Sequence, residues 1–433
     1  MQGLALTDDT HCAYIDPASR CSILGVGQVA AQVKNAAVVV HGPKGCLYPV
    51  YEATLQSNFP YNYTEMCESS VVFGNEEVIR DKILDTYYDN APSLIVVVTT
   101  CSSEIIGDDV DGVIYSLKEE IACPIVKVEG VGFKKNHAES VPHAMGVITE
   151  HLARPACCSK QPAPDINLIP HIGTTSRWKD EANAVRQLLE EAGYTVNLLF
   201  CDSETTALAD AGRAKLNVCI NSEVGEPLAK QLEQTFGTPY LAPVLPIGLE
   251  NCVHFMDNVD HFFSRNNHQR YDDLADTTRT YFRAALGKMA NLNPLELAQR
   301  SATAVIGDKE QVSAYMHTLS RELGITPCLA IIKATELDKD HIQALADEYR
   351  DCRFVCTDDN MVIKKELTAV KPAILLANDF EYQLCKTFCE PSYINISYPG
   401  ARMIRMREEY HVGFKGVLIL AEQIINAVIQ MRF

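Results

Sequence analysis

Residues 37–46 read AVVVHGPKGC, four apolar residues followed by a Gly- and Pro-containing turn that ends on a cysteine. A run that is apolar on successive residues is typical of a strand buried on both faces, as in parallel sheets. Residues 94–101, LIVVVTTC, repeat the order of strand, turn and cysteine. The loops that follow strands in open α/β sheets are where sites form. The pattern therefore predicts an α/β unit in which Cys46 and Cys101 lie close together.

The alternation of apolar runs with helical patterns continues along the whole chain. Strands are expected at 37–40, 94–98, 125–128, 166–169, 196–200, 216–220, 304–306, 328–332, 374–376 and 394–396, and helices at 76–89, 178–192, 226–236, 309–323 and 341–349. Alternating βα units predict doubly wound, mainly parallel sheets. A Pro-rich segment at 154–164 and the end of a polar helical stretch at 291–301 suggest boundaries. We predict three α/β domains: a cluster-binding domain at 1–162, a middle domain at 163–300 and a C-terminal domain at 301–433.

Composition narrows the class of protein. The chain has 433 residues, a formal net charge of −18 and 47% hydrophobic residues, which suits a globular protein and argues against nucleic acid as a partner. The chain contains no run of 18 apolar residues, so no membrane span is predicted. The acidic N-terminal segment lacks the features of a signal peptide, so a cytoplasmic location with reduced thiols is expected. Sixteen cysteines are then unusual, and metal ligation is the question they raise.

Three cysteines stand out because each lies in a glycine-flanked loop. Cys21 opens Cys21-Ser22-Ile23-Leu24-Gly25, Cys46 closes the turn after one predicted strand, and Cys101 follows another. Glycine has no Cβ and lets the backbone approach a bulky group. Soft thiolates are the usual ligands of iron–sulfur clusters. Cys21, Cys46 and Cys101 are therefore the candidate metal ligands.

These motifs resemble the nitrogenase component 1 superfamily. HGPKGC at 41–46 and TTC-x-x-E-I-I-G-D-D-V at 99–110 carry the resemblance, and the spacings of 25 and 55 residues between the three cysteines suit that family. The segment 71–75 resembles the family's VFGG stretch. Pro246-Ile247-Gly248-Leu249 and the tail segments 412–416 and 420–423 resemble the β-type (K) subunits.

The resemblance implies three α/β domains and an α₂β₂ assembly with an α-type (D-like) subunit. It implies a bridging iron–sulfur cluster, either 8Fe–7S and P-cluster-like or 4Fe–4S, held by three cysteines from each subunit; here these are Cys21, Cys46 and Cys101. It also implies a homodimeric, ATP-driven iron protein as electron donor, and an active-site metal cofactor in the partner. Where some members place a serine near the cluster, residues 129–133 read EGVGF and offer no hydroxyl.

The α-type subunit holds its cofactor through one Cys and one His, and this chain matches neither position. The α-type cysteine position falls on Asn221, two residues after Cys219, and His411 lies one residue out of register. A shift of two residues moves a strand side chain by about 6.6 Å. Cys219 and His411 are interpreted as packing residues, so the chain is expected to be β-type, without catalytic residues of its own.

Other candidates carry less weight. Cys67 lies between two of the expected ligands and is interpreted as a loop thiol. Asp108 and Asp109 follow a glycine and are expected to cap the next helix rather than to act as catalytic carboxylates.

The resemblance leaves several functions open. The chain is compact for a dinitrogen-reducing β-subunit, which favours a methylthio-alkane reductase that cleaves a C–S bond and releases methanethiol. The alternatives are the β-subunit of an iron-only or vanadium nitrogenase, and a scaffold that assembles a cofactor. Dark-operative protochlorophyllide reductase and the nickel-tetrapyrrole cyclase resemble the chain more remotely, because they lack this β-type tail.

Overall fold

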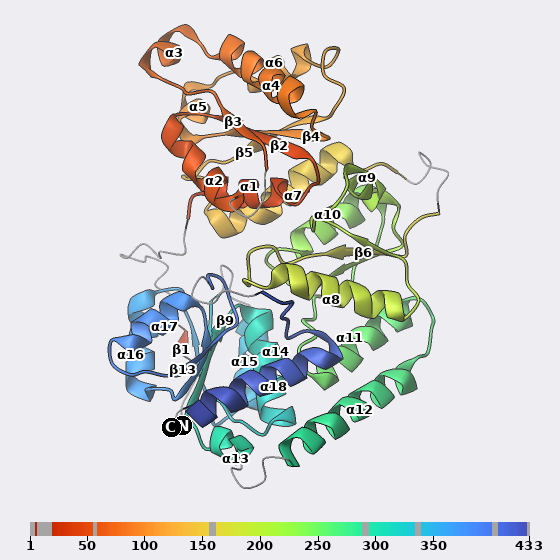
Figure 1. Cartoon of the computed structure of the whole chain (residues 1–433), viewed down its shortest axis with the longest axis vertical. Helices are drawn as coiled ribbons and strands as arrows, with labels where there is room; N and C mark the ends of the chain where they lie inside the picture. The colour runs from red at the N-terminus through yellow and green to blue at the C-terminus, as the bar shows by residue number, and fades with distance from the viewer. Residues whose placement is uncertain are drawn as a thin grey trace. The chain divides into compact units, whose positions relative to one another are not determined.

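The computed structural model describes residues 5–6, 20–54, 59–155, 162–287, 294–333, 339–400 and 406–430. Three parallel sheets form, and the chain divides into two compact units (Figure 1). One unit comprises 19–173 and 192–242, and the other comprises 1–18, 174–191 and 243–433. All pairs of named strands in the described residues are parallel, which confirms the predicted α/β class. The three predicted domain limits stay a prediction, and part of the Pro-rich segment lies outside the described residues.

The first unit holds a four-stranded sheet in the order β3-β2-β4-β5. Its strands are β3 (Tyr61–Tyr63), β2 (Ala36–His41), β4 (Leu94–Thr99) and β5 (Ile125–Glu129). Helices α4 (Glu76–Asn90) and α6 (Val110–Ser116) cover one face, and α1 (Ser22–Ala30) and α7 (His137–Leu152) cover the other (Figure 1). All residues of β2 and β4 are buried, because helices cover both faces of the sheet. Short helices follow the strands: α2 (Tyr48–Thr54), α3 (Glu68–Phe73) and α5 (Cys101–Ile106).

The same unit contains a three-stranded sheet in the order β7-β6-β8. It is built from β7 (Val196–Leu198), β6 (Ile166–Ile169) and β8 (Leu216–Cys219), with helices α9 (Thr205–Ala209) and α10 (Glu226–Phe236). Helix α10 ends before Gly237, whose left-handed conformation is a common way for a helix to end.

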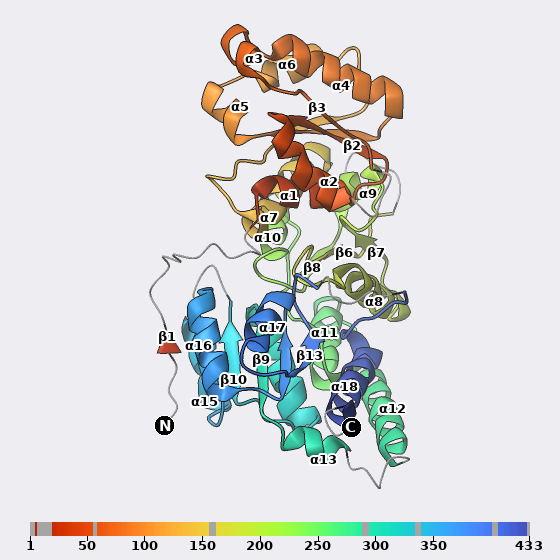
Figure 2. The same cartoon turned by 60° about the vertical axis from the view of Figure 1, so that its left-hand side comes forward.

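The second unit is organised around a six-stranded sheet in the order β1-β11-β10-β9-β12-β13 (Figure 2). The strands are β1 (Ala5–Leu6), β11 (Arg353–Cys356), β10 (Leu329–Ile332), β9 (Thr303–Gly307), β12 (Ile374–Ala377) and β13 (Ser392–Asn395). The helices are α8 (Trp178–Glu191), α11 (Leu249–Phe262), α12 (His268–Gly287), α13 (Pro294–Gln299), α14 (Lys309–His317), α15 (Lys339–Glu348), α16 (Asn360–Val370), α17 (Asp379–Lys386) and α18 (Gly413–Gln430). Helices α16 and α17 pack on one face of the sheet, and α14 contacts β9 and β10.

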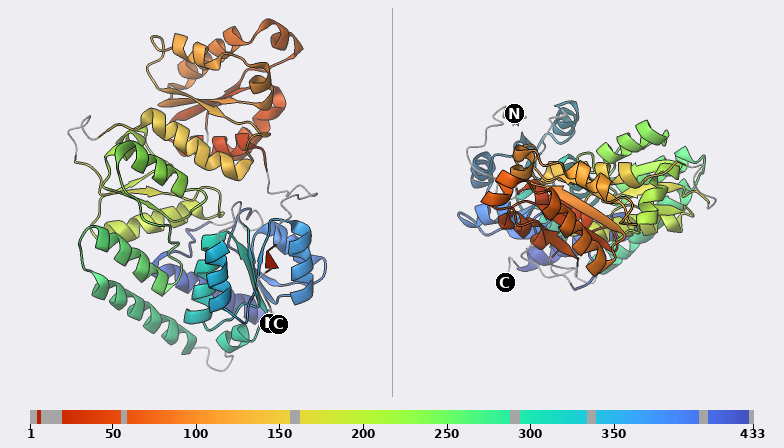
Figure 3. Two further views of the ribbon diagram at one scale, coloured as in Figure 1. Left: turned by 180° about the vertical axis from the view of Figure 1, so that it is seen from behind. Right: turned by 90° about the horizontal axis from the view of Figure 1, so that it is seen from above.

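Helix α18 is the one described helix with the length and composition of a membrane span, at a mean hydropathy of 1.2. Half of it is buried inside the structure, against α11, α12, α13 and β13. Its apolar face therefore serves the core of this unit, where α11 and α12 run side by side (Figure 3).

Candidate metal centre

The three predicted ligands lie in loops at one end of the four-stranded sheet. Cys46 lies in a short 3₁₀ turn, Lys44–Leu47, that follows β2. Cys101 is the first residue of α5 and follows β4. Strands β2 and β4 are paired in parallel, with His41 opposite Thr99, so both loops leave the same edge of the sheet. Cys21 precedes α1 and forms an isolated bridge with Asn136.

A glycine marks the place where these loops meet. The Gly132 N–H donates to Sγ of Cys101 at 3.3 Å. A Cβ placed on Gly132 would lie 3.5 Å from Sγ of Cys21 and 3.7 Å from Sγ of Cys101. The two sulfurs therefore flank one point beside residue 132, and only a residue without a side chain leaves that space open.

Cys46 belongs to the same group. Burial raises the pKa of the Cys46 thiol, and the negative charges that Cys21 and Cys101 can carry raise it further. The turn that leads to Cys46 packs against the residue before Cys101, because a Cβ on Gly42 would lie 2.4 Å from Oγ1 of Thr100. The sulfurs of Cys21 and Cys101 therefore meet at Gly132, and Cys46 lies in the adjacent turn at the same edge of the sheet. Cys21 is exposed, and Cys46 and Cys101 are half-buried, so the group opens to the surface of this chain.

The thiols do not form a site for a single metal ion. Among the described residues, no three His, Cys, Asp or Glu side chains lie close enough to share one ion. A structural zinc site needs four ligands around one centre. Thiolates that each bind a different iron of a larger cluster stand further apart, and soft donors suit iron and sulfide. The donor set and the open space beside Gly132 fit an iron–sulfur cluster.

Exposed apolar side chains follow the cysteine segments along the chain. Tyr48, Ile105 and Phe133 are 67%, 75% and 60% exposed, and they come two, four and one residues after Cys46, Cys101 and Gly132. Ile105 is four residues after Cys101 on α5, a spacing that places both on one helix face. We refer to Tyr48, Ile105 and Phe133 as the apolar rim.

The two aspartates after α5 differ from each other. Asp109 caps α6, accepting from the Gly112 N–H at 2.9 Å, which confirms the predicted capping role. For Asp108 that prediction is wrong. Its carboxylate is 3% exposed and bonds to His41 and Asn75, because the loop turns it inward under the sheet edge.

Cys67 is exposed at the start of α3, where its Sγ lies 3.1 Å from Oγ of Ser69. Hydrogen bonds from the Ser69 hydroxyl and from Ser70 lower the pKa of the Cys67 thiol.

Cys219 ends β8 and is buried beside Gly225.

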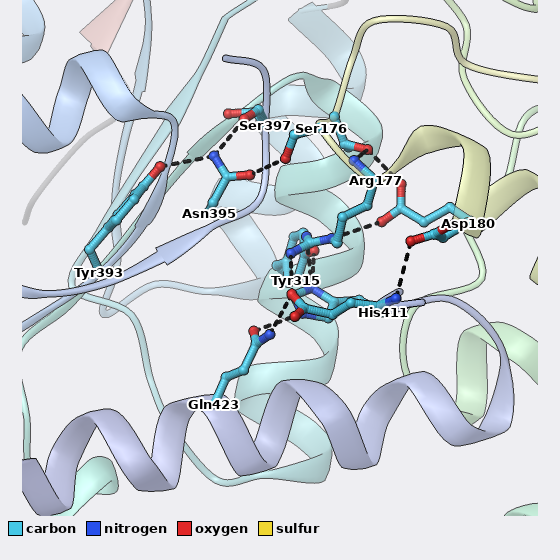
Figure 4. A network of polar contacts seen from close by, with 12 residues as sticks. Ser176, Arg177, Asp180, Tyr315, Tyr393, Asn395, Ser397, His411 and Gln423 are labelled. Carbon is cyan, nitrogen blue, oxygen red and sulfur yellow. Dashed lines mark hydrogen bonds and ion pairs between the residues drawn. The ribbon is translucent and has the colours of Figure 1, made fainter. Parts of the chain in front are cut away.

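His411 lies in a buried polar network (Figure 4). Its Nδ1 lies 3.2 Å from Nη2 of Arg177 and 2.6 Å from the hydroxyl of Tyr315. Arginine only donates, so Nδ1 accepts, and Nε2 donates to Oε1 of Gln423 at 2.9 Å. Both ring nitrogens are therefore engaged in hydrogen bonds, which supports the interpretation of His411 as a packing residue.

Comparison with known proteins gives one family model, two relatives and one solved structure. The family model described as "Nitrogenase component 1 type Oxidoreductase" matches residues 21–429. The B subunit of light-independent protochlorophyllide reductase from Synechocystis sp. is 22% identical over 416 residues, which cover 93% of this chain and 81% of the relative. The corresponding protein of Synechococcus elongatus is 23% identical over 419 residues, covering 94% and 80%. The solved structure "Nitrogenase Cp1 at pH 6.5" aligns with a TM-score of 0.82 at 17% identity, over 98% of this chain and 95% of that one.

Proposed function

The chain belongs to the nitrogenase component 1 type oxidoreductases, and from that membership we propose that it is the β-type, electron-relay subunit of a nitrogenase-like reductase. In this proposal Cys21, Cys46 and Cys101 hold half of a bridging cluster, 8Fe–7S or 4Fe–4S, shared with an α-type subunit in an α₂β₂ complex. When bound, the cluster supplies one-electron storage between an ATP-driven iron protein and the partner's metal cofactor.

The meeting of the Cys21 and Cys101 sulfurs at Gly132, with Cys46 in the adjacent turn at the same edge of the sheet, is the observation that carries this proposal. The Gly132 N–H donates to Sγ of Cys101, and such a bond stabilises thiolate charge. Hydrogen bonds to the sulfurs and exclusion of solvent are the means by which a protein sets a cluster's potential. These residues therefore bind the cluster and adjust its electron affinity.

The apolar rim supports a partner at the same place. Half-exposed thiols cannot exclude water from a cluster by themselves, and Tyr48, Ile105 and Phe133 present apolar surface beside them. Buried interface centres are enriched in aromatic residues and depleted in charge. We therefore assign the rim to the interface with the α-type subunit.

The test of the electron-relay role is reduction of the cluster within the assembled complex. Mixed anaerobically with its iron protein and MgATP, the wild-type complex should show a change in the cluster's electron paramagnetic resonance signal before product forms. The Cys101→Ala complex should show neither this change in the signal nor product formation. Product formation without any change in a cluster signal would refute the relay role.

The substrate is a further part of the proposal. We propose a methylthio-alkane as the first candidate substrate, reduced with release of methanethiol, because this is the substrate class that the sequence resemblance favours. The similarity to light-independent protochlorophyllide reductase favours a second candidate, reduction of a tetrapyrrole ring double bond. Methanethiol detection and the absorption spectrum of the tetrapyrrole separate the two, and acetylene reduction would indicate an alternative nitrogenase. A cofactor-assembly scaffold would release a cluster precursor without turnover.

A further inference from the structure

His41, the last residue of β2, links the strand that precedes Cys46 to the segment that follows Cys101. Its side chain is fully buried. Nδ1 lies 3.0 Å from Oγ1 of Thr64, which follows β3, and Nε2 lies 2.8 Å from Oδ2 of Asp108. Asp108 follows α5, the helix that begins at Cys101. One imidazole thus connects the strand that leads to Cys46 with the loop that leaves Cys101.

The hydrogen-bond partners assign the proton on this ring. A carboxylate accepts, so Nε2 carries the hydrogen and donates to Asp108. Nδ1 then accepts from the Thr64 hydroxyl, whose oxygen in turn accepts from the Gly42 N–H at 3.1 Å. Burial lowers the pKa of His41 and outweighs the opposing effect of Asp108, which fits a neutral imidazole. His41 is therefore a fixed donor on one side and a fixed acceptor on the other.

Asp108 has a second anchor. The side-chain amide of Asn75, the residue before α4, donates to both carboxylate oxygens at 3.2 and 3.0 Å. Since Asp109 caps α6, Asp108 is not needed for that role. A buried carboxylate held by side-chain N–H groups is costly unless its partners remain in place.

The Thr100 side chain is also in contact with the backbone of the Cys46 loop. The Thr100 hydroxyl, one residue before Cys101, donates to the His41 carbonyl at 3.0 Å. A Cβ on Gly42 would lie 2.4 Å from Oγ1 of Thr100, so no side chain fits there. The loops of Cys46 and Cys101 therefore pack directly against each other above the His41–Asp108 bond.

From these contacts we infer that His41 and Asp108 are a positioning pair, which fixes the Cys46 loop relative to the Cys101 loop and thereby the spacing of two cluster ligands. The inference rests on the proposed function, because it presupposes that these cysteines bind a cluster. Neither residue touches the cluster ligands; both act through the loops. The buried carboxylate of Asp108 also places negative charge beneath the site, which opposes addition of electrons to a cluster.

Three variants of the anaerobic complex with the α-type partner test the pair. His41→Leu removes both ring hydrogen bonds. His41→Gln keeps them, because its amide can donate to Asp108 and its carbonyl can accept from Thr64. Asp108→Asn removes the negative charge and turns either an NH₂ group or an uncharged oxygen toward the two donors, His41 and Asn75, which weakens or breaks these hydrogen bonds. Asn167→Ala is the control: Asn167 is a buried residue in the three-stranded sheet, bonded to Asn217 at 2.8 Å.

The measurements are iron per folded chain, the reduction potential of the cluster that remains, and the melting temperature. We expect His41→Leu and Asp108→Asn to hold less than half the wild-type iron, and His41→Gln to hold most of it. The cluster left in Asp108→Asn should have a higher potential than in the wild type. Asn167→Ala should lose melting temperature but keep its iron and its potential.

Two results would overturn the inference. One is wild-type iron and potential in folded His41→Leu and Asp108→Asn. The other is a loss of iron in Asn167→Ala equal to that in the pair variants at the same melting temperature. If His41→Leu does not fold, the contrast between His41→Gln and Asp108→Asn decides, and equal iron in both counts against the pair. A wild-type complex without any cluster would instead refute the proposed function.

Discussion

Substitution of Gly132 by alanine separates the folding of this chain from its capacity to hold a cluster. The added Cβ would lie 3.5 Å from Sγ of Cys21 and 3.7 Å from Sγ of Cys101, which is ordinary van der Waals contact. The φ angle of Gly132 is outside the left-handed region. The empty chain should therefore tolerate alanine, and a reduced entropy of the unfolded chain should stabilise it by about 0.4–1 kcal/mol.

The cluster-bound state should respond in the opposite direction. Metal–thiolate bonds are about 2.3 Å long, so cluster atoms bound to Cys21 and Cys101 would compete with the new methyl group for the space between the sulfurs. Such overpacking costs about 1–3 kcal/mol, which corresponds to roughly 5- to 150-fold weaker binding.

The assay measures iron and acid-labile sulfide per folded chain in the anaerobic complex, with the melting temperature of each variant. Gly287→Ala is the matched control, because its Cβ at the end of α12 meets nothing within 4 Å. We expect Gly132→Ala to melt no lower than the wild type yet to lose most of its iron. Full iron content in Gly132→Ala would show that the space between these sulfurs is not where a cluster binds.

Three further predictions concern burial, pH and the interface. Arg177→Met leaves the carboxylates of Glu181 and Glu409 without their buried guanidinium partner, so the free energy of unfolding measured in urea should fall by about 3–5 kcal/mol. A fall of less than about 1 kcal/mol would contradict the view that this guanidinium compensates buried charge. Burial and, secondarily, the charge of Arg20 lower the pKa of His137 from 6.5 to about 4, so the unfolded chain binds a proton first as the pH falls. Stability is then lost below pH 6.5, by about 2 kcal/mol at pH 5, and His137→Gln should flatten this part of the pH profile. Ile105→Asp should weaken assembly with the α-type subunit by more than tenfold in sedimentation, since an apolar side chain is worth about 1.5–3 kcal/mol when buried; unchanged assembly would remove the rim from the interface.

The sequence predicted the sheets well because buried parallel strands are continuous apolar runs. Residues 166–169 coincide with β6, and the runs at 37–40 and 94–98 lie inside β2 and β4. Strands with mixed composition escaped prediction. The edge strand β3 is Tyr-Asn-Tyr, and β11 begins with Arg353, whose guanidinium pairs with Glu366. The segment predicted as one helix at 309–323 forms the α-helix α14 up to His317, and a π-helical turn follows at Thr318–Glu322.

The candidate site was predictable only in part. Parallel strands ending at one edge explain why the proximity of Cys46 and Cys101 could be foreseen from the two loops. The family resemblance placed residues 129–133 near the cluster, but residue type and spacing do not reveal that Gly132 lies between the sulfurs of Cys21 and Cys101. The bond between His41 and Asp108 joins residues 67 positions apart, and local patterns favoured a capping role for that aspartate. Long-range hydrogen bonds have no periodic signature in a sequence.

The most direct test of the central claim is iron and sulfide analysis of the anaerobically purified complex with its α-type partner, in the wild type and in Cys46→Ala. The account predicts an iron–sulfur signal in the wild-type complex and its loss, or conversion to a smaller cluster, in the variant. A complex without iron and sulfide, or a Cys46→Ala complex with the full wild-type cluster, would contradict it.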